Sequence, residues 1–224
     1  MERIEVRFPD GTAKSYPKGI MLKDLLADSS IRGKADEIVT AKVDGVLLDL
    51  QTPLPKGGLL EWVSIASEQG MEVLRHSTSH VMAQAVQSLF PGAKLTIGPA
   101  IKEGFYYDFD FDRSFSPEDF PRIEAKMQEI IDQDLPIVRR AVLREEALRI
   151  FQERDEPYKR ELIAELSDGE VTLYQQGEFI DLCRGPHLSS TGKIKAFKLT
   201  SVAGAYWRGD ERNKMLQRIY GTAF

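Results

Sequence analysis

Cysteine and histidine are scarce in this chain of 224 residues, which contains one cysteine and three histidines. A single cysteine excludes an internal disulfide. No apolar run approaches the roughly 20 residues of a membrane-spanning helix, and no basic-then-apolar signal segment is visible. We therefore expect a soluble protein of a reducing compartment, the cytoplasm, without a membrane partner.

Charge is unevenly distributed along the chain. The net charge of -5 argues against a protein that coats nucleic acid, and 42% apolar residues indicate a real core in one large or two small domains. The segment 191–224 is nevertheless basic, with two acidic residues against Lys193, Lys195, Lys198, Arg208, Arg212, Lys214 and Arg218. Such a segment can attract a polyanion, and a solvated charged face is the alternative.

The histidines and the cysteine fall into two motifs of the same shape. His-Ser-Thr-Ser-His runs from His76 to His80, and Cys-Arg-Gly-Pro-His runs from Cys183 to His187. Imidazole and thiol groups titrate closest to neutral pH, which suits them to acid-base, nucleophilic or metal chemistry. Two pairs with equal spacing indicate one assembled site.

The first part of the chain has the pattern of a small β domain. A hairpin is expected over residues 4–16, a short helix over 21–26, a second hairpin over 39–50 and a last strand over 59–65. This order within about 65 residues predicts a β-grasp, ubiquitin-like domain at 1–65. It contains no cluster of chemically active residues, so we assign it a role in interaction or scaffolding.

Residues 66–224 alternate between helical and strand patterns and predict an α+β domain with an antiparallel sheet and flanking helices. Helices are expected at 71–90, 116–133, 145–154 and 158–166. Strands are expected at 105–111, 136–142, 171–175 and 179–183. The strand at 105–111 carries an aromatic face that includes Tyr107.

Periodicity places the candidate residues. On the helix at 71–90, His76 and His80 are four residues apart and point away from the centre of the apolar stripe, so they indicate a cleft and not the core. On the strand at 179–183, alternation puts Asp181 and Cys183 on the same face.

Three chemistries fit His76, His80, Cys183 and His187. The first is a zinc site, although the glutamate of a metalloprotease helix is missing between the histidines. The second is a Cys-His nucleophile pair. The third is metal-free hydrolysis, in which imidazoles, a lysine and Asp181 position water and a polar substrate. Residue types alone leave all three open.

Several further motifs together resemble the N-terminal half of a bacterial-type threonyl-tRNA synthetase. They are His76 to His80, Ile97-Gly98-Pro99, Gly104 to Asp108, Pro157-Tyr158-Lys159, Asp181 to His187, Gly204 to Asp210 and Asn213 to Ala223. The resemblance is ordered and extends over the whole chain. It implies a TGS module of β-grasp type in the first 65 residues, followed by an editing domain that hydrolyses mischarged Ser-tRNA(Thr).

The resemblance also implies roles for individual residues. His76, Lys159 and Asp181 are the expected catalytic residues, with His76 and Lys159 positioning water and stabilising the oxyanion. Asp181 would receive the ammonium or hydroxyl group of the substrate. The expected substrate-binding residues are His80, Tyr107, Cys183 and His187. Without the resemblance, Lys159 and Tyr107 are more simply a solvated lysine and a core aromatic.

No cofactor is expected for editing, although related alanyl-type editing domains hold zinc through a similar set. The alternative metal site would use His76, His80, Cys183 and His187. We favour the metal-free site because the ammonium of Lys159 would be repelled by a dication. Two other functions remain as alternatives: a free-standing zinc-dependent deacylase and a non-catalytic RNA-binding module with a structural zinc.

In the family that the chain resembles, a class II threonine-tRNA ligase, an ATP-dependent synthetic core follows this region. We therefore expect a truncated piece of a longer chain that acts as an aminoacyl-tRNA deacylase and does not aminoacylate. Its expected partners are the acceptor end of tRNA(Thr) carrying a seryl group and the rest of the synthetase.

Overall fold

The computed structural model describes residues 2–26 and 32–224. The chain divides into two compact units, residues 1–73 with 185–189 and residues 74–184 with 190–224. Both are mixtures of helices and mainly antiparallel sheets, so the expected α+β class is found.

The first unit contains one five-stranded sheet. Its described elements are β1 (Arg3–Arg7), β2 (Ala13–Pro17), α1 (Leu22–Leu25), a 3-10 helix (Arg32–Glu37), β3 (Ile38–Val43), β4 (Val46–Leu48) and β5 (Gly58–Ser64). The strand order is β2-β1-β5-β3-β4. The pair β1 and β5 is parallel and the other pairs are antiparallel.

Turn chemistry explains the two hairpins of this sheet. Asp44 and Gly45, which connect β3 and β4, have φ values of 50° and 81°, as the two central residues of a hairpin turn require. Gly11 has a φ of 84° in the turn between β1 and β2. The alternating apolar residues of the strands then face one core, together with Leu22 and Leu25 of α1.

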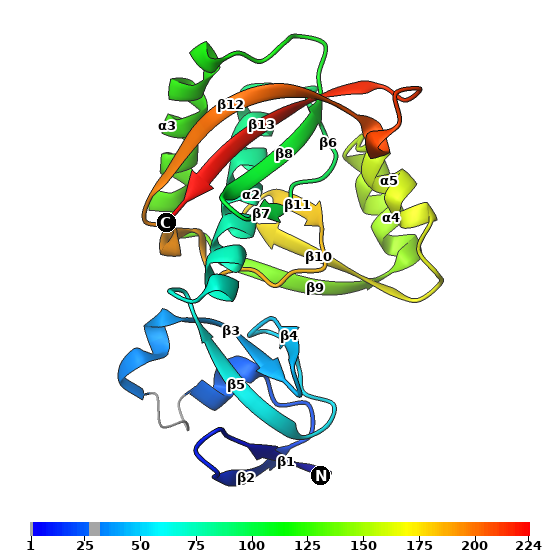
Figure 1. The fold of residues 1–224 in the computed structure, drawn as a ribbon. Coiled ribbons are helices and arrows are strands. Elements are labelled where there is room, and N and C mark those ends of the chain that lie inside the picture. Colours follow the sequence, from blue (N-terminus) through cyan, green and yellow to red (C-terminus); the bar gives the residue numbers. More distant parts are fainter. Residues whose placement is uncertain (1, 27–31) are drawn as a thin grey trace. The chain divides into compact units, whose positions relative to one another are not determined.

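The second unit contains two antiparallel sheets (Figure 1). The smaller sheet has the order β11-β10-β9, and the larger has the order β12-β13-β8-β6, with β7 paired to β8. The strands are β6 (Lys94–Leu95), β7 (Ala100–Ile101), β8 (Gly104–Asp110), β9 (Ile137–Leu143), β10 (Glu170–Gln176), β11 (Phe179–Leu182), β12 (Phe197–Tyr206) and β13 (Met215–Ala223).

Four helices accompany these sheets: α2 (Glu68–Leu89), α3 (Phe120–Asp132), α4 (Arg144–Glu153) and α5 (Pro157–Ala164). Single-turn 3-10 helices lie at Pro117–Asp119, Thr191–Lys193 and Trp207–Gly209. The side chain of Asp119 accepts a hydrogen bond from the backbone N–H of Ser116 at 2.9 Å, which satisfies a free donor before α3. Apolar side chains of α4 and α5 form one core cluster with the smaller sheet.

Burial of helix α2 includes hydroxyl-bearing residues as well as its apolar stripe. Ser77, Thr78 and Ser79 are as inaccessible as the stripe residues Val81 and Met82. Hydroxyl groups bonded to helix carbonyls make this burial tolerable, because Thr78 Oγ1 donates to Leu74 O at 2.8 Å. The part of α2 that carries the histidines is therefore largely buried, with His80 4% exposed and His76 half-buried.

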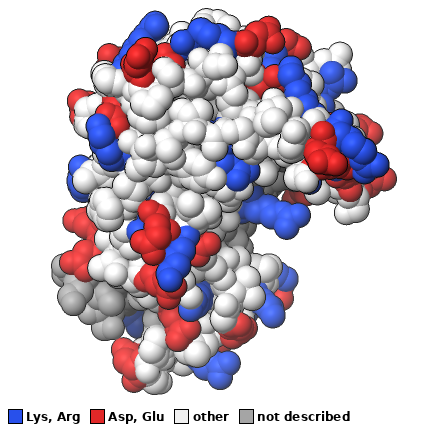
Figure 2. All heavy atoms as spheres, turned by 45° about the horizontal axis from the view of Figure 1, so that its top comes forward, with Lys and Arg blue, Asp and Glu red and all other residues white. Residues whose placement is uncertain are grey.

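The basic segment 191–224 contains the whole hairpin β12–β13, which the sequence patterns did not predict. Its cations are largely neutralised by carboxylates: Lys198 pairs with Glu124, Arg208 with Glu161 and Glu165, Arg212 with Asp210, Lys214 with Asp110, and Arg218 with Asp108. Along the upper part of the face drawn in Figure 2, positive and negative side chains lie next to one another. The segment is therefore less electropositive than its composition indicates.

Within residues 2–26 and 32–224, no helix combines the length and the apolar character needed to cross a membrane.

Candidate functional site

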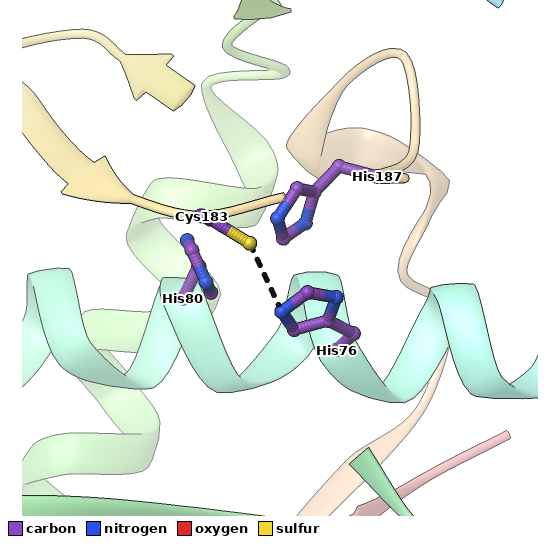
Figure 3. Close-up of side chains that lie close together, drawn as sticks. All are labelled: His76, His80, Cys183 and His187. Carbon is purple, nitrogen blue, oxygen red and sulfur yellow. Dashed lines mark hydrogen bonds between the residues drawn. The ribbon is translucent and has the colours of Figure 1, made fainter. Parts of the chain in front are cut away.

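Three of the predicted site residues come together on α2 and at the end of β11. His76 and His80 lie on successive turns of α2, with their ring centroids 5.1 Å apart. Cys183 follows β11, and its Sγ lies 3.3 Å from Nε2 of His76 (Figure 3). Two motifs separated by about a hundred residues thus meet, as their matching spacing indicated.

The pairing of β11 with β10 explains the position of Cys183 relative to Asp181. Asp181 lies opposite Tyr174, and the backbone N–H of Cys183 continues the ladder by donating to Thr172 O at 3.2 Å. The two side chains therefore leave the same face of the sheet, as alternation predicted. Asp181 Oδ2 lies 3.7 Å from Nε2 of His80, next to the contact between Cys183 and His76.

Beside the histidines lies a buried cluster of Lys159, Asp181 and Tyr107. The hydroxyl of Tyr107 donates to Asp181 Oδ2 at 2.6 Å, and Lys159 Nζ donates to the Tyr107 oxygen at 3.0 Å. Lys159 Nζ also forms an ion pair with Asp181 Oδ1. The three side chains come from α5, β11 and β8, so the cluster joins both sheets of the second unit.

The charges of this cluster are arranged to compensate one another. Burial opposes ionisation of Asp181, but the Lys159 ammonium, His80 and the hydrogen bonds from Lys159 and Tyr107 outweigh it and hold its pKa below the usual range. Burial, followed by the nearby Asp181 carboxylate, raises the pKa of Tyr107 well above its ordinary value. Asp181 is thus a carboxylate and Tyr107 a neutral donor at neutral pH.

His80 is a neutral imidazole at neutral pH. Burial lowers its pKa to about 3, although Asp181 acts in the opposite direction, and His76 and Lys159 add to the decrease. Its ring packs edge-on against Phe179, with centroids 6.2 Å apart, and against Tyr107, with centroids 6.3 Å apart. His80 is therefore suited to donate or accept a hydrogen bond and not to carry charge.

Accessibility separates the site into two layers. Lys159 and Asp181 are 2% and 1% exposed, whereas His76 and Cys183 are half-buried. Lys159 is therefore not a solvated helix lysine, which was the simpler interpretation of the sequence. The layer of His76 and Cys183 is thus partly open to solvent, and the ionic cluster is sealed from it.

His187 lies in the short segment 185–189, which groups with the first unit. Its side chain is buried, and its backbone N–H donates to Asp49 Oδ2 at 3.2 Å. One ligand atom each from His76, His80, Cys183 and His187 lies within 4.8 Å of the others. These four are residues that could hold a metal ion.

These donors fit zinc in type and approximately in spacing. Tetrahedral zinc with histidine and cysteine ligands requires donor atoms roughly 3.5 Å apart. The sequence argument against zinc was repulsion by Lys159, but the ammonium of Lys159 is already paired with Asp181. That repulsion is therefore weaker than expected, and the chemistry of the donors alone does not decide between a metal and a metal-free site.

Gly98 has a structural role in the site that sequence reasoning did not assign. A Cβ atom at this position would lie 2.0 Å from Cδ2 of Tyr107, so only glycine allows the tyrosine ring to pack here. The single O–H of Ser79 is shared between Gly98 O at 2.6 Å and His76 O at 2.8 Å, which ties α2 to this loop. The motif at residues 97–99 was noted in the sequence, but a glycine gives no sign of what packs on it.

Glu156 was missed altogether. It is 2% exposed, and burial raises the pKa of its carboxyl to about 7. In the sequence it is an ordinary acidic residue at the start of a helix, beside Pro157, and its burial is set by tertiary structure.

Comparison with known proteins places these residues in a wider context. Residues 171–220 match the family model of the threonyl and alanyl tRNA synthetase second additional domain. This segment includes Asp181, Cys183 and His187.

Over its full length the chain is 54% identical to a threonine–tRNA ligase of Geobacter sp. strain M21, across 224 residues. It is 53% identical to the enzyme of the same name from Halalkalibacterium halodurans and 50% identical, over 222 residues, to that of Geobacillus kaustophilus. The chain spans 35%, 35% and 34% of these relatives, about a third of their length. It is thus similar to a part of threonine–tRNA ligases that includes the second additional domain.

Proposed function

We propose that this chain is the editing part of a threonine–tRNA ligase and hydrolyses the ester of mischarged Ser-tRNA(Thr). One observation carries the proposal: the accessible pair of His76 and Cys183 lies over the sealed cluster of Lys159, Asp181 and Tyr107. The similarity to threonine–tRNA ligases and to their second additional domain supports the same conclusion.

The need for such a reaction follows from the size of the substrates. Serine lacks one methyl group of threonine, and a missing methyl changes binding in a pocket by only about 1 to 3 kcal/mol. A synthetic site built for threonine therefore accepts serine too often. A second site that removes serine restores accuracy, and it must reject threonine by its additional methyl.

In the proposed reaction, water attacks the ester carbonyl. His76 orients this water and accepts its proton, because its imidazole is the accessible one of the pair on α2. The bond to the tRNA ribose oxygen then breaks, the proton passes to that oxygen, and serine and free tRNA leave. Lys159 supplies positive charge beneath the developing oxyanion.

Asp181 is the proposed partner of the substrate ammonium or hydroxyl group. Because Asp181 is 1% exposed, this role requires side chains packed around it to move when the substrate binds. His80, Tyr107, Cys183 and His187 are proposed to bind the seryl and ribose groups.

The remaining features of the proposal concern the rest of the molecule. The first unit is proposed to be a TGS domain of β-grasp type, which its central parallel pair β1–β5 in a mixed five-stranded sheet supports. We propose that the chain acts in the cytoplasm with the acceptor end of tRNA(Thr) and the rest of a synthetase, and that hydrolysis needs no cofactor.

A zinc-dependent deacylase is the second candidate, favoured by the four gathered donors. In that case His76, His80, Cys183 and His187 would hold the metal, which would supply a Lewis acid. Lys159 and Asp181 would keep the same contacts and orient the ammonium group of the substrate.

The test is hydrolysis of Ser-tRNA(Thr) and Thr-tRNA(Thr) by the 224-residue protein and by its His76→Ala variant. We expect faster hydrolysis of the seryl ester by the wild-type protein and a loss of at least about 100-fold in the variant, since a positioned general base contributes 10²- to 10⁴-fold. Arg75→Ala on the neighbouring position of α2 is the control and should retain activity.

Equal rates for the wild-type protein and His76→Ala would disprove the role of His76. Equal rates on the two esters would disprove the editing specificity. Unfolding curves of each variant exclude loss of fold as the reason for a decrease.

A further inference from the structure

Glu156 is a buried acid whose carboxylate attaches the start of α5 to two other elements. Its Oε1 accepts a hydrogen bond from Gln87 Nε2 of α2 at 2.5 Å. Its Oε2 accepts one from the backbone N–H of Leu95 in β6 at 2.9 Å. Neither contact involves a residue of the site described above, and the carboxylate is buried, so its observed contacts are structural.

The backbone of Glu156 is fixed as well. Its N–H donates to Phe151 O of α4 at 2.9 Å, and its carbonyl accepts from the N–H of Arg160 at 3.2 Å. Glu156 is therefore the point at which α2, β6, α4 and α5 are held together. Since α5 has only eight residues, its position depends strongly on how its first turn is attached.

Lys159 lies one turn after Glu156 on α5. Its ammonium must contact both the Tyr107 oxygen at 3.0 Å and the Asp181 carboxylate. Lysine has a flexible stem of four carbons, so packing has to fix the position of its ammonium group. A displacement of α5 by about 1 Å would move this group away from its partners, and such a shift can cost 100-fold in rate.

We propose that Glu156 is a positioning residue for the hydrolytic reaction: its attachment to Gln87 and Leu95 fixes the start of α5 and thereby holds Lys159 against Asp181 and Tyr107. The inference rests on the proposed function, but the positioning of Lys159 can be tested without it.

The charged groups around Glu156 are Lys159 on its own helix, Asp181 on β11 and Lys94 on β6. The attachment does not depend on the negative charge of the carboxylate. A protonated Glu156 carboxyl, or the amide of a glutamine at this position, can donate to Oε1 of Gln87 once the Gln87 amide turns over. The remaining oxygen of residue 156 still accepts from the N–H of Leu95. Glu156→Gln is thus a conservative variant that keeps both attachments, whereas Glu156→Ala removes both.

The first arm of the test measures how accessible Lys159 is to an amine-acetylating reagent, with the modified peptide quantified by mass spectrometry. Lys159 is 2% exposed, so its labelling should be slow in the wild-type protein. We expect Glu156→Ala to increase the labelling rate at least about fivefold and Glu156→Gln to leave it within about twofold of wild type. Glu153→Ala, at an exposed acid on α4, is the matched control and should not change it.

The second arm measures kcat and KM for hydrolysis of Ser-tRNA(Thr). We expect Glu156→Ala to lower kcat at least about tenfold with little change in KM, and Glu156→Gln to restore most of the loss. If Glu156→Ala does not fold, Gln87→Ala replaces it, because it removes one of the two attachments and should increase the labelling of Lys159 severalfold.

The two arms separate the two proposals. If the wild-type protein does not hydrolyse the ester but labelling of Lys159 rises in Glu156→Ala, the positioning role is supported and the proposed function fails. Unchanged labelling and unchanged kcat in a folded Glu156→Ala, or in Gln87→Ala, would overturn the positioning role. Equal losses in Glu156→Gln and Glu156→Ala would also overturn it, because charge and not attachment would then be responsible.

Discussion

Lys159 and Asp181 are opposite charges that are both almost completely buried. Such a pair contributes little net stability when intact, because desolvation of each ion offsets their attraction. Removing one partner is different, since the other charge stays buried without compensation. The pair therefore makes the site sensitive to single substitutions, and it places the Asp181 carboxylate together with its lysine partner beside His80.

This sensitivity gives a prediction for stability. Replacing Lys159 by methionine should lower the free energy of unfolding by about 3 to 5 kcal/mol, because Asp181 loses its counterion. The double variant Lys159→Met with Asp181→Leu should be more stable than the single variant. Urea unfolding monitored by circular dichroism measures both. If Lys159→Met were as stable as the double variant, Asp181 would have found another partner or taken up a proton with no loss of unfolding free energy.

Glu156 gives a prediction for the pH dependence of stability. Burial raises its pKa to about 7, although Leu95 and Lys159 act in the opposite direction. A carboxyl whose pKa is raised by folding contributes stability below its unfolded pKa, near 4.5, and this contribution is lost as the pH rises through about 7. Relative to Glu156→Gln, the wild-type protein should gain about 3 kcal/mol of unfolding free energy between pH 8 and pH 4.5.

The measurement is a series of urea unfolding curves for both proteins between pH 4.5 and pH 8. Because every other titrating group is shared, only the difference between the two curves reports on Glu156. A difference that does not change with pH would mean that the Glu156 carboxyl titrates normally in the folded protein.

The gathering of His76, His80 and Cys183 could be predicted from spacing and from scarcity of their residue types. The same-face position of Asp181 followed from strand alternation. The contacts of Lys159 and Tyr107 were available only through the resemblance, because an isolated lysine or tyrosine carries no periodic signal. The position of Glu156 could not be predicted, since its burial depends on α2 and β6 packing around it.

At the scale of elements, Ser79 joins α2 to the loop between β6 and β7, and Gly98 in that loop lets Tyr107 approach. The packing of Tyr107 in the site therefore depends on the absence of a side chain at Gly98. This arrangement connects the helix that carries the histidines with the strand that carries the tyrosine.

The variant Gly98→Ala should disturb both stability and activity. Its Cβ would overlap the Tyr107 ring, and overpacking of this kind costs about 1 to 3 kcal/mol. Displacement of the ring also weakens the hydrogen bond from Tyr107 to Asp181, so hydrolysis should fall at least about tenfold. Thermal unfolding and single-turnover hydrolysis measure the two effects. Ile97→Ala, at the preceding residue with a 38% exposed side chain, is the control and should change neither much.

Most elements followed from local patterns, and the reasons are visible in particular cases. The hairpin around Asp44 and Gly45 has the turn residues that its φ values require, and the helix at 71–90 has a clear apolar period. The pair β12–β13 was missed because β12 alternates poorly: Thr200, Ser201, Ala203 and Gly204 are all exposed. A strand with so many small exposed residues depends on pairing with its neighbour and lacks its own hydrophobic signal.

At the scale of the whole molecule, the electrostatic attraction that a segment exerts differs from what its composition suggests. The segment 191–224 has an excess of cations, but carboxylates from other elements pair with most of them, so the segment exerts little long-range attraction. Contacts with RNA phosphates would require these ion pairs to open. Any binding of tRNA should therefore depend on fewer residues than the composition indicates.

Lys198 tests this point because it pairs with Glu124 at 2.7 Å. Lys198→Gln should change tRNA affinity less than about twofold and leave the slope of log affinity against log salt unchanged. A lysine that contacts a phosphate would reduce that slope by about 0.9. Filter binding between 50 and 200 mM salt measures the slope. Lys195→Gln is the comparison, because Lys195 Nζ donates to the carbonyl of Gly192 and lies in the same segment.

Whether the protein binds a metal is tested on the whole molecule, because folding and hydrolysis respond differently for a metal-free site and a zinc site. In the metal-free site, the contacts among Lys159, Asp181 and Tyr107 form without a metal, so treatment with a chelator should leave both the unfolding curve and the rate of hydrolysis unchanged. Elemental analysis should find far less than one zinc per chain.

One zinc per chain, with hydrolysis lost on chelation and restored by zinc, would identify the four donors as a catalytic metal site. Zinc that is needed for folding and not for hydrolysis would identify a structural site, since such sites contribute directly to the free energy of folding.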